Sequence, residues 1–262
     1  VKAGTLDRFV ATFERCGFAA KSFFPCYGMA EATVMVSGKR DPGLLPIRCD
    51  REGNTQIGCG PALAGEDLAI VDPTDARRLP AAAIGEIWLR GPNIVSRYWD
   101  AEGSSRRTFG ATIAGETGRW MRTGDLGFVD ETGELFVTGR LKELIIIRGH
   151  NHYPHDIEWT VRECHPAFQN QMSAAFAVES AAGPSVVVLQ ELDRTWRRAE
   201  SKAELERAVR EAVTLEHAVA VDRVVILPAG SIPRTTSGKV QRLRARDLWL
   251  GGAYQVDRAD AG

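Results

Sequence analysis

Residues 223–250 read RVVILPAGSIPRTTSGKVQRLRARDLWL, and this stretch contains the pattern of a strand, a loop and a helix. The apolar, β-branched run 223–227 predicts a strand. The Pro, Thr, Ser and Gly residues of 233–238 predict a flexible loop, and helix 240–250 is expected to follow it. Lys239 ends this loop, where a lysine is a mobile point charge with three hydrogen-bond donors.

The residues before this stretch predict a small α+β domain. The β-branched run 144–148 is followed by an expected helix at 155–164, strands at 172–179 and 185–191, and a helix at 201–217. Ser201 and Glu204 have the spacing of a capping box. A β-α-β-β-α-β order is typical of a small α+β domain, which places its boundary near residues 140–143. The tail 251–262 is expected to fray.

Strands dominate the first part of the chain from residue 66 onward. They are expected at 67–71, 86–90, 121–129 and 134–138, separated by turn residues, and this spacing predicts a small barrel or sandwich. Before them we expect a helix at 5–16 with Thr5 as N-cap and Gly17 at its end, a strand at 22–27, a helix at 29–37 and a loop at 38–60. The chain thus divides into an α/β part, 1–141, and an α+β part, 142–262.

Composition excludes several classes of function. The 262 residues are 44% apolar and 26% charged, which is ordinary for a globular domain, and the net charge of −1 gives no indication of a nucleic-acid partner. The five cysteines, without a CxxC pair, indicate reduced thiols of a cytoplasmic protein, rather than a disulfide framework or a zinc site. No stretch approaches the roughly 20 apolar residues that span a membrane.

Residues 27–31, YGMAE, join the expected strand to the expected helix. A glycine at this junction permits close approach of a ligand to the backbone. Tyr27 offers an aromatic face for stacking, and Glu31 offers a carboxylate of the kind that holds Mg²⁺. The structural alternative is a buried tyrosine and an acidic residue favoured by a helix N-terminus.

Residues 120–125, WMRTGD, place Asp125 just after a Thr-Gly turn. A carboxylate there can accept hydrogen bonds from both hydroxyls of a ribose, or it can simply cap the turn. Arg140 ends the last expected strand and can reach phosphate or ribose. Lys142 and Glu143 lie where a hinge would sit, or they form an exposed linker.

His150, His152 and His155 superficially resemble a metal cluster. We reject that interpretation, because residues 151–154 form a turn and no acidic or cysteine ligand lies at a supportive spacing.

Four motifs in order carry a family resemblance: YGMAE at 27–31, WMRTGD at 120–125, GRLKELIIIRG at 139–149 and IPRTTSGK at 232–239. Together they resemble the second half of the adenylate-forming superfamily, which includes acyl-CoA synthetases, peptide-synthetase adenylation domains and luciferases. Ala-Glu-Ala-Thr at 30–33, Gly-Asp-Leu-Gly-Phe at 124–128 and above all IIIRGHNHYPHDIE at 145–158 closely resemble fatty acyl-AMP ligases. The resemblance covers residues 20–245.

The resemblance implies an activity and a fold. Members form an acyl-adenylate from a carboxylic acid and Mg-ATP with release of pyrophosphate. Fatty acyl-AMP ligases then pass the acyl group to the pantetheine arm of an acyl carrier protein, using free coenzyme A poorly. Residues 1–141 would be the C-terminal portion of the large AMP-binding domain, with a small β-barrel-like subdomain, and 142–262 a small lid domain.

The same resemblance assigns roles to individual residues. Tyr27, Gly28 and Met29 would line the adenine and acyl-phosphate site, and Glu31 would be a catalytic residue that helps to hold Mg²⁺. Asp125 would bind the ribose with Arg140 beside it, and Lys142 would be the hinge. Lys239 would bridge the carboxylate and the α-phosphate, because two anions react only when cations offset their repulsion.

Three alternatives remain open. No Gly/Ser/Thr-rich phosphate loop precedes residue 27, so we expect these residues alone not to catalyse adenylation. The chain could belong to an acyl-CoA ligase or an amino-acid-activating domain of the same superfamily. It could also be a non-catalytic remnant that docks a carrier protein. The presence of Glu31, Asp125, Arg140 and Lys239 at matching positions argues against a remnant.

Overall fold

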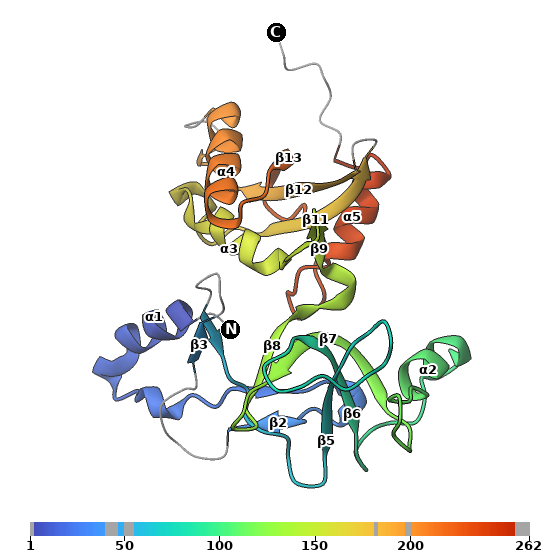
Figure 1. Ribbon diagram of the computed structural model, residues 1–262. Coiled ribbons are helices and arrows are strands. Elements are labelled where there is room, and N and C mark those ends of the chain that lie inside the picture. The colour runs from blue at the N-terminus through green and yellow to red at the C-terminus, as the bar shows by residue number, and fades with distance from the viewer. Residues whose placement is uncertain (1–2, 40–46, 50–54, 181–182, 197–200, 255–262) are drawn as a thin grey trace. The chain divides into compact units, whose positions relative to one another are not determined.

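The computed structural model describes residues 3–39, 47–49, 55–180, 183–196 and 201–254. The chain divides into two compact units, Val1–Leu141 and Lys142–Gly262, which Figure 1 shows in blue to green and in green to red. Each unit has hydrophobic clusters of its own. No helix in the described part of the chain has the length and apolarity needed to cross a bilayer.

An open, four-stranded antiparallel sheet forms the centre of the first unit. Its order is β5 (Asp67–Val71), β6 (Gly85–Arg90), β7 (Met121–Val129) and β8 (Leu135–Arg140). All four strands were expected from the sequence, but the expected small barrel is wrong, since β5 and β8 lie at opposite edges of the sheet.

Both faces of this sheet are covered by other segments, which explains why it stays open. Ile70, Ile87 and Leu89 face a cluster with Tyr27 and Val36. The alternate positions Ala69, Val71 and Trp88 face Ile113 and Trp120. Side chains of a strand alternate between the two faces of a sheet. Loop segments on both faces therefore bury the apolar side chains, and the sheet does not need to close into a barrel to bury them.

The first 60 residues differ most from expectation. Helix α1 runs over Ala3–Phe13 and a 3-10 turn follows at Glu14–Cys16, so Thr5 lies inside the helix and is not its N-cap. Gly17, with φ of 85°, ends this segment as expected. The expected strand 22–27 is reduced to β1 (Cys26–Tyr27), which pairs with β2 (Ser37–Gly38).

The expected helix 29–37 is also wrong. Only a 3-10 turn, Ala30–Ala32, forms there, because Thr33 and Val34 have φ values of 51° and 81° that no right-handed helix contains. The expected loop 38–60 includes a hairpin of β3 (Ile47–Cys49) and β4 (Thr55–Ile57), and its remaining stretches at 40–46 and 50–54 lie outside the described residues. Helix α2 (Glu102–Phe109) was not predicted.

A three-stranded sheet and three helices form the second unit. Its strands are β11 (Ser173–Ser180), β12 (Gly183–Leu192) and β13 (Val221–Pro228), with β11 antiparallel and β13 parallel to β12. A hairpin of β9 (Ile145–Ile147) and β10 (His150–His152) precedes them. The helices are α3 (Pro154–Glu163), α4 (Lys202–His217) and α5 (Arg242–Leu250). The expected α+β pattern is confirmed.

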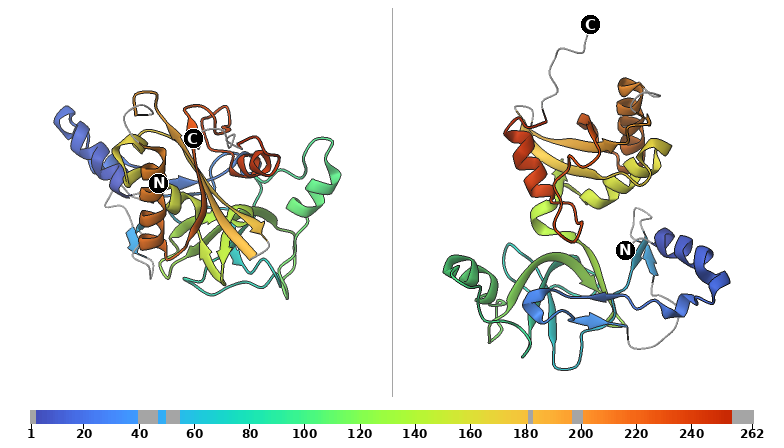
Figure 2. Two further views of the ribbon diagram at one scale, coloured as in Figure 1. Left: turned by 90° about the horizontal axis from the view of Figure 1, so that it is seen from above. Right: turned by 180° about the vertical axis from the view of Figure 1, so that it is seen from behind.

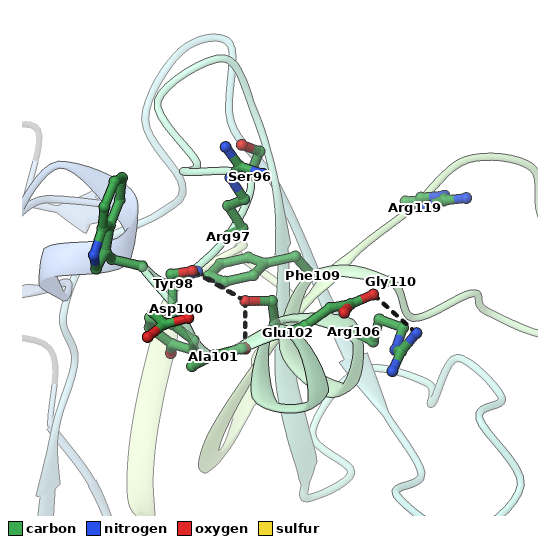
Figure 3. Close-up of a pocket in the computed structure, with 12 residues that line it drawn as sticks. Ser96, Arg97, Tyr98, Asp100, Ala101, Glu102, Arg106, Phe109, Gly110 and Arg119 are labelled. Atoms are coloured by element: carbon green, nitrogen blue, oxygen red, sulfur yellow. Dashed lines mark hydrogen bonds and ion pairs between the residues drawn. The ribbon is translucent and has the colours of Figure 1, made fainter.

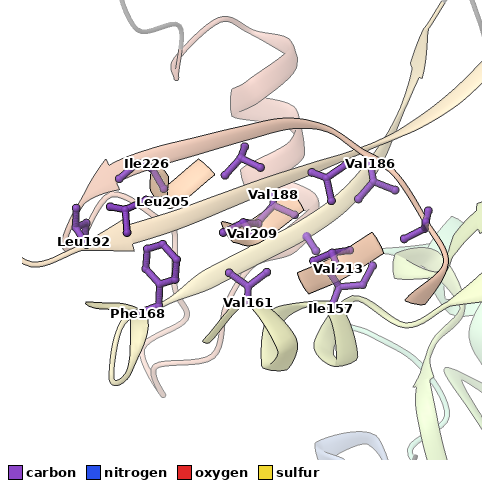
Figure 4. Packing of buried hydrophobic residues seen from close by; sticks show 14 of the residues in the cluster. Ile157, Val161, Phe168, Val186, Val188, Leu192, Leu205, Val209, Val213 and Ile226 are labelled. Carbon is purple, nitrogen blue, oxygen red and sulfur yellow. The ribbon is translucent and has the colours of Figure 1, made fainter. Parts of the chain in front are cut away.

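The helices cover both faces of the sheet, as Figure 1 and Figure 2 show. Val186 and Val188 of β12 pack with residues of α3 and α4 (Figure 4). The alternate residues Val187 and Leu189 pack with Ala245 of α5. This alternation holds α5, and the segment before it, against one face of a rigid sheet.

Two smaller expectations can be compared with the structure. Ser201 precedes α4 as expected, but its side chain makes no capping bond, so the capping box is wrong. The backbone N–H of Glu204 donates to the Ser201 carbonyl instead. Residues 255–262 of the expected frayed tail lie outside the described residues.

Thiol reactivity is expected to separate the four cysteines whose side chains the structure describes into two groups. Cys16 and Cys26 are exposed, whereas burial raises the pKa of Cys59 and of Cys164 to about 11. Because the thiolate is the reactive form, iodoacetamide near pH 8 should alkylate Cys16 and Cys26 first. The rates at Cys59 and Cys164 should still be rising as the pH approaches about 11. Timed alkylation with peptide mass spectrometry checks this, and equal rates near pH 8 would contradict it.

Candidate functional site

Asp125 forms the centre of a polar cluster in the first unit. Its Oδ2 accepts a hydrogen bond from the Tyr27 hydroxyl at 2.7 Å, and its Oδ1 lies 2.9 Å from Nε of Arg140. The Asp125 side chain is 9% exposed whereas that of Arg140 is 63% exposed. Burial first, and then the charge of Asp125, raises the pKa of Tyr27 far above its usual value, so the phenol stays a donor.

The strands position this cluster. Asp125 and Arg140 are direct partners in the antiparallel register of β7 and β8. Gly124, with φ of 73°, lies inside β7 where its register with β6 shifts, so the turn expected before Asp125 is an irregularity of the strand. The backbone N–H of Asp125 donates to Oγ1 of Thr123 at 3.0 Å, which fixes the main chain on which the carboxylate stands.

A buried carboxylate holds this irregular part of β7. Glu86 is 2% exposed, and its Oε1 accepts the N–H of Gly124 at 3.1 Å. Its Oε2 accepts Nε and Nη2 of Arg122 at 2.9 and 2.6 Å. The sequence interpretation missed Glu86, although a charged residue inside the apolar run of β6 signals a partner, because buried charges are paired.

The loop after Tyr27 is closed by backbone hydrogen bonds. The N–H of Val36 donates to the Tyr27 carbonyl at 2.9 Å and that of Val34 to the Met29 carbonyl at 3.0 Å. A Cβ added to Gly28 would lie 1.7 Å from the carbonyl oxygen of Val34. Only glycine fits at this position, because the backbone of Val34 lies directly against Gly28.

Glu31 projects from the 3-10 turn of this loop. Its Oε1 accepts a hydrogen bond from the Tyr98 hydroxyl at 2.8 Å, and the side chains are part-buried. Burial first, and then this bond, raises the pKa of Tyr98. Tyr98 was missed in the sequence, because nothing in its spacing links it to residue 31.

The donor set near Glu31 fits a magnesium ion that is bound mainly through a nucleotide. Mg²⁺ takes one or two carboxylates plus phosphate and water oxygens. Glu31 supplies one carboxylate. Among the described residues no group of three His, Cys, Asp or Glu side chains is arranged to hold a metal by itself.

A pocket of about 1120 Å³ lies beside Tyr98, lined by residues of the 96–119 segment (Figure 3). Arg106 and Glu102 form an ion pair at its wall, at 3.1 Å, and Trp99 is 94% exposed. None of the site residues expected from the sequence lines this pocket.

Lys239 ends a closed turn in the second unit rather than the flexible loop that was expected. The N–H of Thr235 donates to the Lys239 carbonyl at 2.8 Å, and the N–H of Lys239 donates to Oγ1 of Thr235 at 3.0 Å. Gly238 has φ of 82°, and Arg234 and Val240 pair as an isolated bridge. The turn presents Lys239 as an exposed residue on a hydrogen-bonded base.

A buried glutamate anchors the segment that leads from β13 into this turn. Glu191, 1% exposed, lies near the end of β12, after Gln190 and before Leu192. Its Oε1 accepts the N–H of Ile232 at 2.8 Å, and its Oε2 accepts Nη2 of Arg234 at 2.7 Å. The sequence interpretation missed this pair, although Glu191 in an apolar strand carried the same signal as Glu86.

A second ion-pair network anchors the chain that leaves the turn. Arg242 donates through Nε and Nη2 to the two oxygens of Glu158, at 2.6 and 2.7 Å, and through Nη1 to Glu143 at 2.7 Å. Glu143 follows Lys142, which is exposed at the start of this unit. The lid side of the expected site is therefore tied to the expected hinge segment within one unit.

The structure thus groups the expected residues into two sets. Tyr27, Asp125 and Arg140 meet directly, and Gly28, Met29 and Glu31 belong to the loop that leaves Tyr27. Lys142 and Lys239 belong to the other unit. Their assigned roles in binding, catalysis and hinge motion remain predictions.

Comparisons with known proteins identify relatives over nearly the whole chain. Residues 2–99 match the AMP-binding enzyme family, and residues 142–259 match the AMP domain of Disco-interacting protein 2-like proteins. The medium-chain-fatty-acid–[acyl-carrier-protein] ligase JamA of Moorena producens is 40% identical over 273 residues, covering 96% of this chain and 46% of the relative. TtuA of Teredinibacter turnerae, with the same enzyme name, is 35% identical over 94% of this chain and 42% of its own length.

Solved structures also match this chain over nearly its whole length. A structure of fatty acyl-adenylate ligases from E. coli and L. pneumophila is 28% identical with a TM-score of 0.79, covering 97% of this chain and 46% of that one. McyG A-PCP complexed with phenylalanyl-adenylate is 25% identical with a TM-score of 0.78, covering 97% and 44%. The chain therefore spans under half the length of the relatives that it matches.

Proposed function

The chain belongs to the adenylate-forming superfamily, where it groups with the fatty acyl-AMP ligases, and on this premise we propose that it supplies the ribose site and the adenylation lysine of a ligase that activates a fatty acid with ATP. The observation that carries the proposal is the buried Asp125, which is held between the Tyr27 hydroxyl and the Arg140 guanidinium. Residues 1–141 would belong to the large AMP-binding domain and 142–262 to the lid.

Asp125 is suited to bind a ribose. A carboxylate has about four acceptor positions, and Tyr27 and Arg140 each use one oxygen. In the proposed complex, ribose hydroxyls would donate hydrogen bonds to this carboxylate. Arg140 is largely exposed, so its other N–H groups are free to approach phosphate or ribose oxygens.

The loop after Tyr27 would contact the rest of the nucleotide. Gly28 is exposed and lacks a side chain, so its backbone can lie close to a ligand, and Met29 is half-buried beside it. Magnesium, when bound with the nucleotide, would neutralise phosphate charge, and Glu31 is the carboxylate that would help to hold it.

Lys239 would supply the positive charge that adenylation requires. The fatty-acid carboxylate and the α-phosphate are both anions, and their approach is costly unless a cation lies between them. A lysine at the end of a closed turn fulfils this role with its position fixed by the lid, while its four-carbon stem provides reach.

The acyl acceptor is proposed to be an acyl carrier protein, in a cytoplasmic reaction. Two relatives are named medium-chain fatty-acid ligases of the acyl carrier protein, which supports a fatty acid as the substrate and a carrier protein as the partner. Another relative is named a putative fatty-acid–CoA ligase, so coenzyme A is the acceptor to compare. We also propose that adenylation requires residues that these relatives carry outside the matched part.

Replacing Asp125 with asparagine tests the ribose site. The substitution removes the charge but keeps the shape, and a hydrogen bond to a charged group contributes about 1.5–3 kcal/mol. The Kd for ATP should therefore rise roughly tenfold to a hundredfold. Isothermal titration calorimetry on the full-length protein that contains this chain measures it.

Asp75→Asn provides the matched control, since the Asp75 side chain is 45% exposed and pairs only with the neighbouring Arg77 in the described contacts. Its Kd should stay at the wild-type value. An Asp125→Asn protein that melts normally and binds ATP as tightly as wild type would exclude Asp125 from the ribose site.

A further inference from the structure

Arg242 joins three segments of the second unit. It lies at the first position of α5, and its three guanidinium nitrogens contact Glu158 on α3 and Glu143 in the 3-10 turn Leu141–Glu143. The Arg242 side chain is 20% exposed, and those of Glu143 and Glu158 are 16% and 6% exposed. Within the described residues, Arg242 is the cation that both carboxylates share.

This network places one arginine and two glutamates together in a largely buried position. Glu158 also accepts the backbone N–H of Ala175 at 3.0 Å, which ties it to β11. Burial raises the pKa of Glu158, and the Arg242 guanidinium counteracts this. A buried carboxylate destabilises the fold unless an oppositely charged group lies close to it. The planar guanidinium of Arg242 carries donors on more than one side, so it binds Glu158 and Glu143 together. The geometry of all three side chains is therefore closely determined.

We propose that Arg242 is a positioning residue that couples the hinge segment Leu141–Glu143 to the turn carrying Lys239, so that Lys239 moves together with the hinge segment. This inference rests on the proposed roles of Lys142 and Lys239. Arg242 is three residues from Lys239 along the chain, and Glu143 is adjacent to Lys142.

The turn that carries Lys239 is also held by contacts on its incoming side. The segment that enters it is fixed by Glu191 through Ile232 and Arg234, and Arg234 and Val240 at its two ends pair as an isolated bridge. With Arg242 in place, the outgoing chain is fixed as well. A rotation at Lys142 would then move Lys239 as part of one rigid body, whereas loss of the Glu143 contact would release the hinge segment from the lysine.

The Glu143–Arg242 contact can be weakened in two ways, and only the first leaves the buried Arg242–Glu158 pair in place. Glu143→Gln keeps shape and removes charge, and Arg242→Lys keeps charge and removes the fork. In the full-length protein, each should lower kcat of ATP–pyrophosphate exchange about tenfold to a hundredfold, the cost of a misplaced catalytic group. KM for ATP should change less than about twofold, because positioning acts on the chemical step. Arg244→Gln is the control, since Arg244 is exposed on the same helix.

The double variant gives the readout that a merely structural role would not move. If Glu143 and Arg242 act as one link, the double variant should be no slower than the slower single variant. Three results would each overturn the inference. The first is a double variant whose loss of kcat is the product of the two single losses. The others are a kcat within about twofold of wild type in the single variants, and a loss of kcat that only follows a lower folded fraction in thermal melts. Lys239→Ala is measured in parallel: if it retains exchange, the proposed function itself fails, and if it alone abolishes exchange, only the coupling fails.

Discussion

Replacing Lys239 with alanine is expected to lower the rate of acyl-adenylate formation about a thousandfold, at the upper end of what loss of one charge-stabilising donor costs. The reason is that Lys239 is the cation that the turn presents, and its backbone is held by Thr235 whatever the side chain. The variant should therefore fold normally. ATP–pyrophosphate exchange in the full-length protein measures the effect.

Lys202→Ala is the matched control for this prediction. Lys202 is an exposed lysine of the same unit, at the start of α4, so its removal should leave exchange at the wild-type rate. An Lys239→Ala protein whose exchange stays within about tenfold of wild type would show that the enzyme uses a different cation. Equal losses in both variants would indicate a general effect of charge.

Replacing Gly28 with alanine is expected to disrupt the first unit. The new Cβ would lie 1.7 Å from the Val34 carbonyl oxygen and 2.6 Å from its carbon, so the backbone of the loop must move. Overpacking a filled site costs about 1–3 kcal/mol and occasionally more, and we expect the upper end of that range. Because the same loop carries Tyr27 and Glu31, nucleotide affinity should fall with stability. Chemical denaturation and ATP titration measure the two effects.

Gly4→Ala separates this clash from a general effect of adding a methyl group. Gly4 lies in α1 with nothing within 4 Å of an added Cβ. Alanine at this helical position should be neutral or stabilising by up to about 1 kcal/mol. If Gly28→Ala also left stability and ATP affinity unchanged, the tight closure of the Tyr27–Val36 loop would be disproved.

Most elements of the second unit, although not strand β10, and the sheet of the first could be predicted because their signals are local. Val186 to Leu189 and the four strands from Asp67 onward have β-branched or alternating patterns bounded by turn residues. The barrel could not be predicted, because closure depends on which segments cover the sheet faces. Tyr27 and Trp120 settle that by packing on opposite sides, and no local pattern specifies such long-range contacts.

The helix expected at 29–37 failed for a backbone reason. Thr33 and Val34 adopt positive φ, which is rare for residues with a branched side chain. The loop also carries three of the residues proposed to contact nucleotide. Strained backbone often accumulates at binding sites, so a local rule failed at a place where function is proposed.

The site residues that were found and missed differ in a consistent way. Asp125, Arg140 and Lys239 belong to motifs that can be identified one at a time. Their supporting residues, Glu86, Glu191 and Arg242, act through contacts with partners between 36 and 99 positions away, and only the fold specifies those partners. Glu191 and Arg234 are 43 residues apart and Glu143 and Arg242 are 99 apart. A buried charge in an apolar run was the one signal present in the sequence.

The most direct test of the proposed function is to identify the product that the full-length protein makes from Mg-ATP and a medium-chain fatty acid. Mass spectrometry of the reaction, with and without an acyl carrier protein, provides the measurement. We expect a fatty acyl-adenylate and pyrophosphate, both lost in the Lys239→Ala variant, and acyl transfer to the carrier protein. Formation of ADP and phosphate, or an adenylate from amino acids but not from fatty acids, would contradict it.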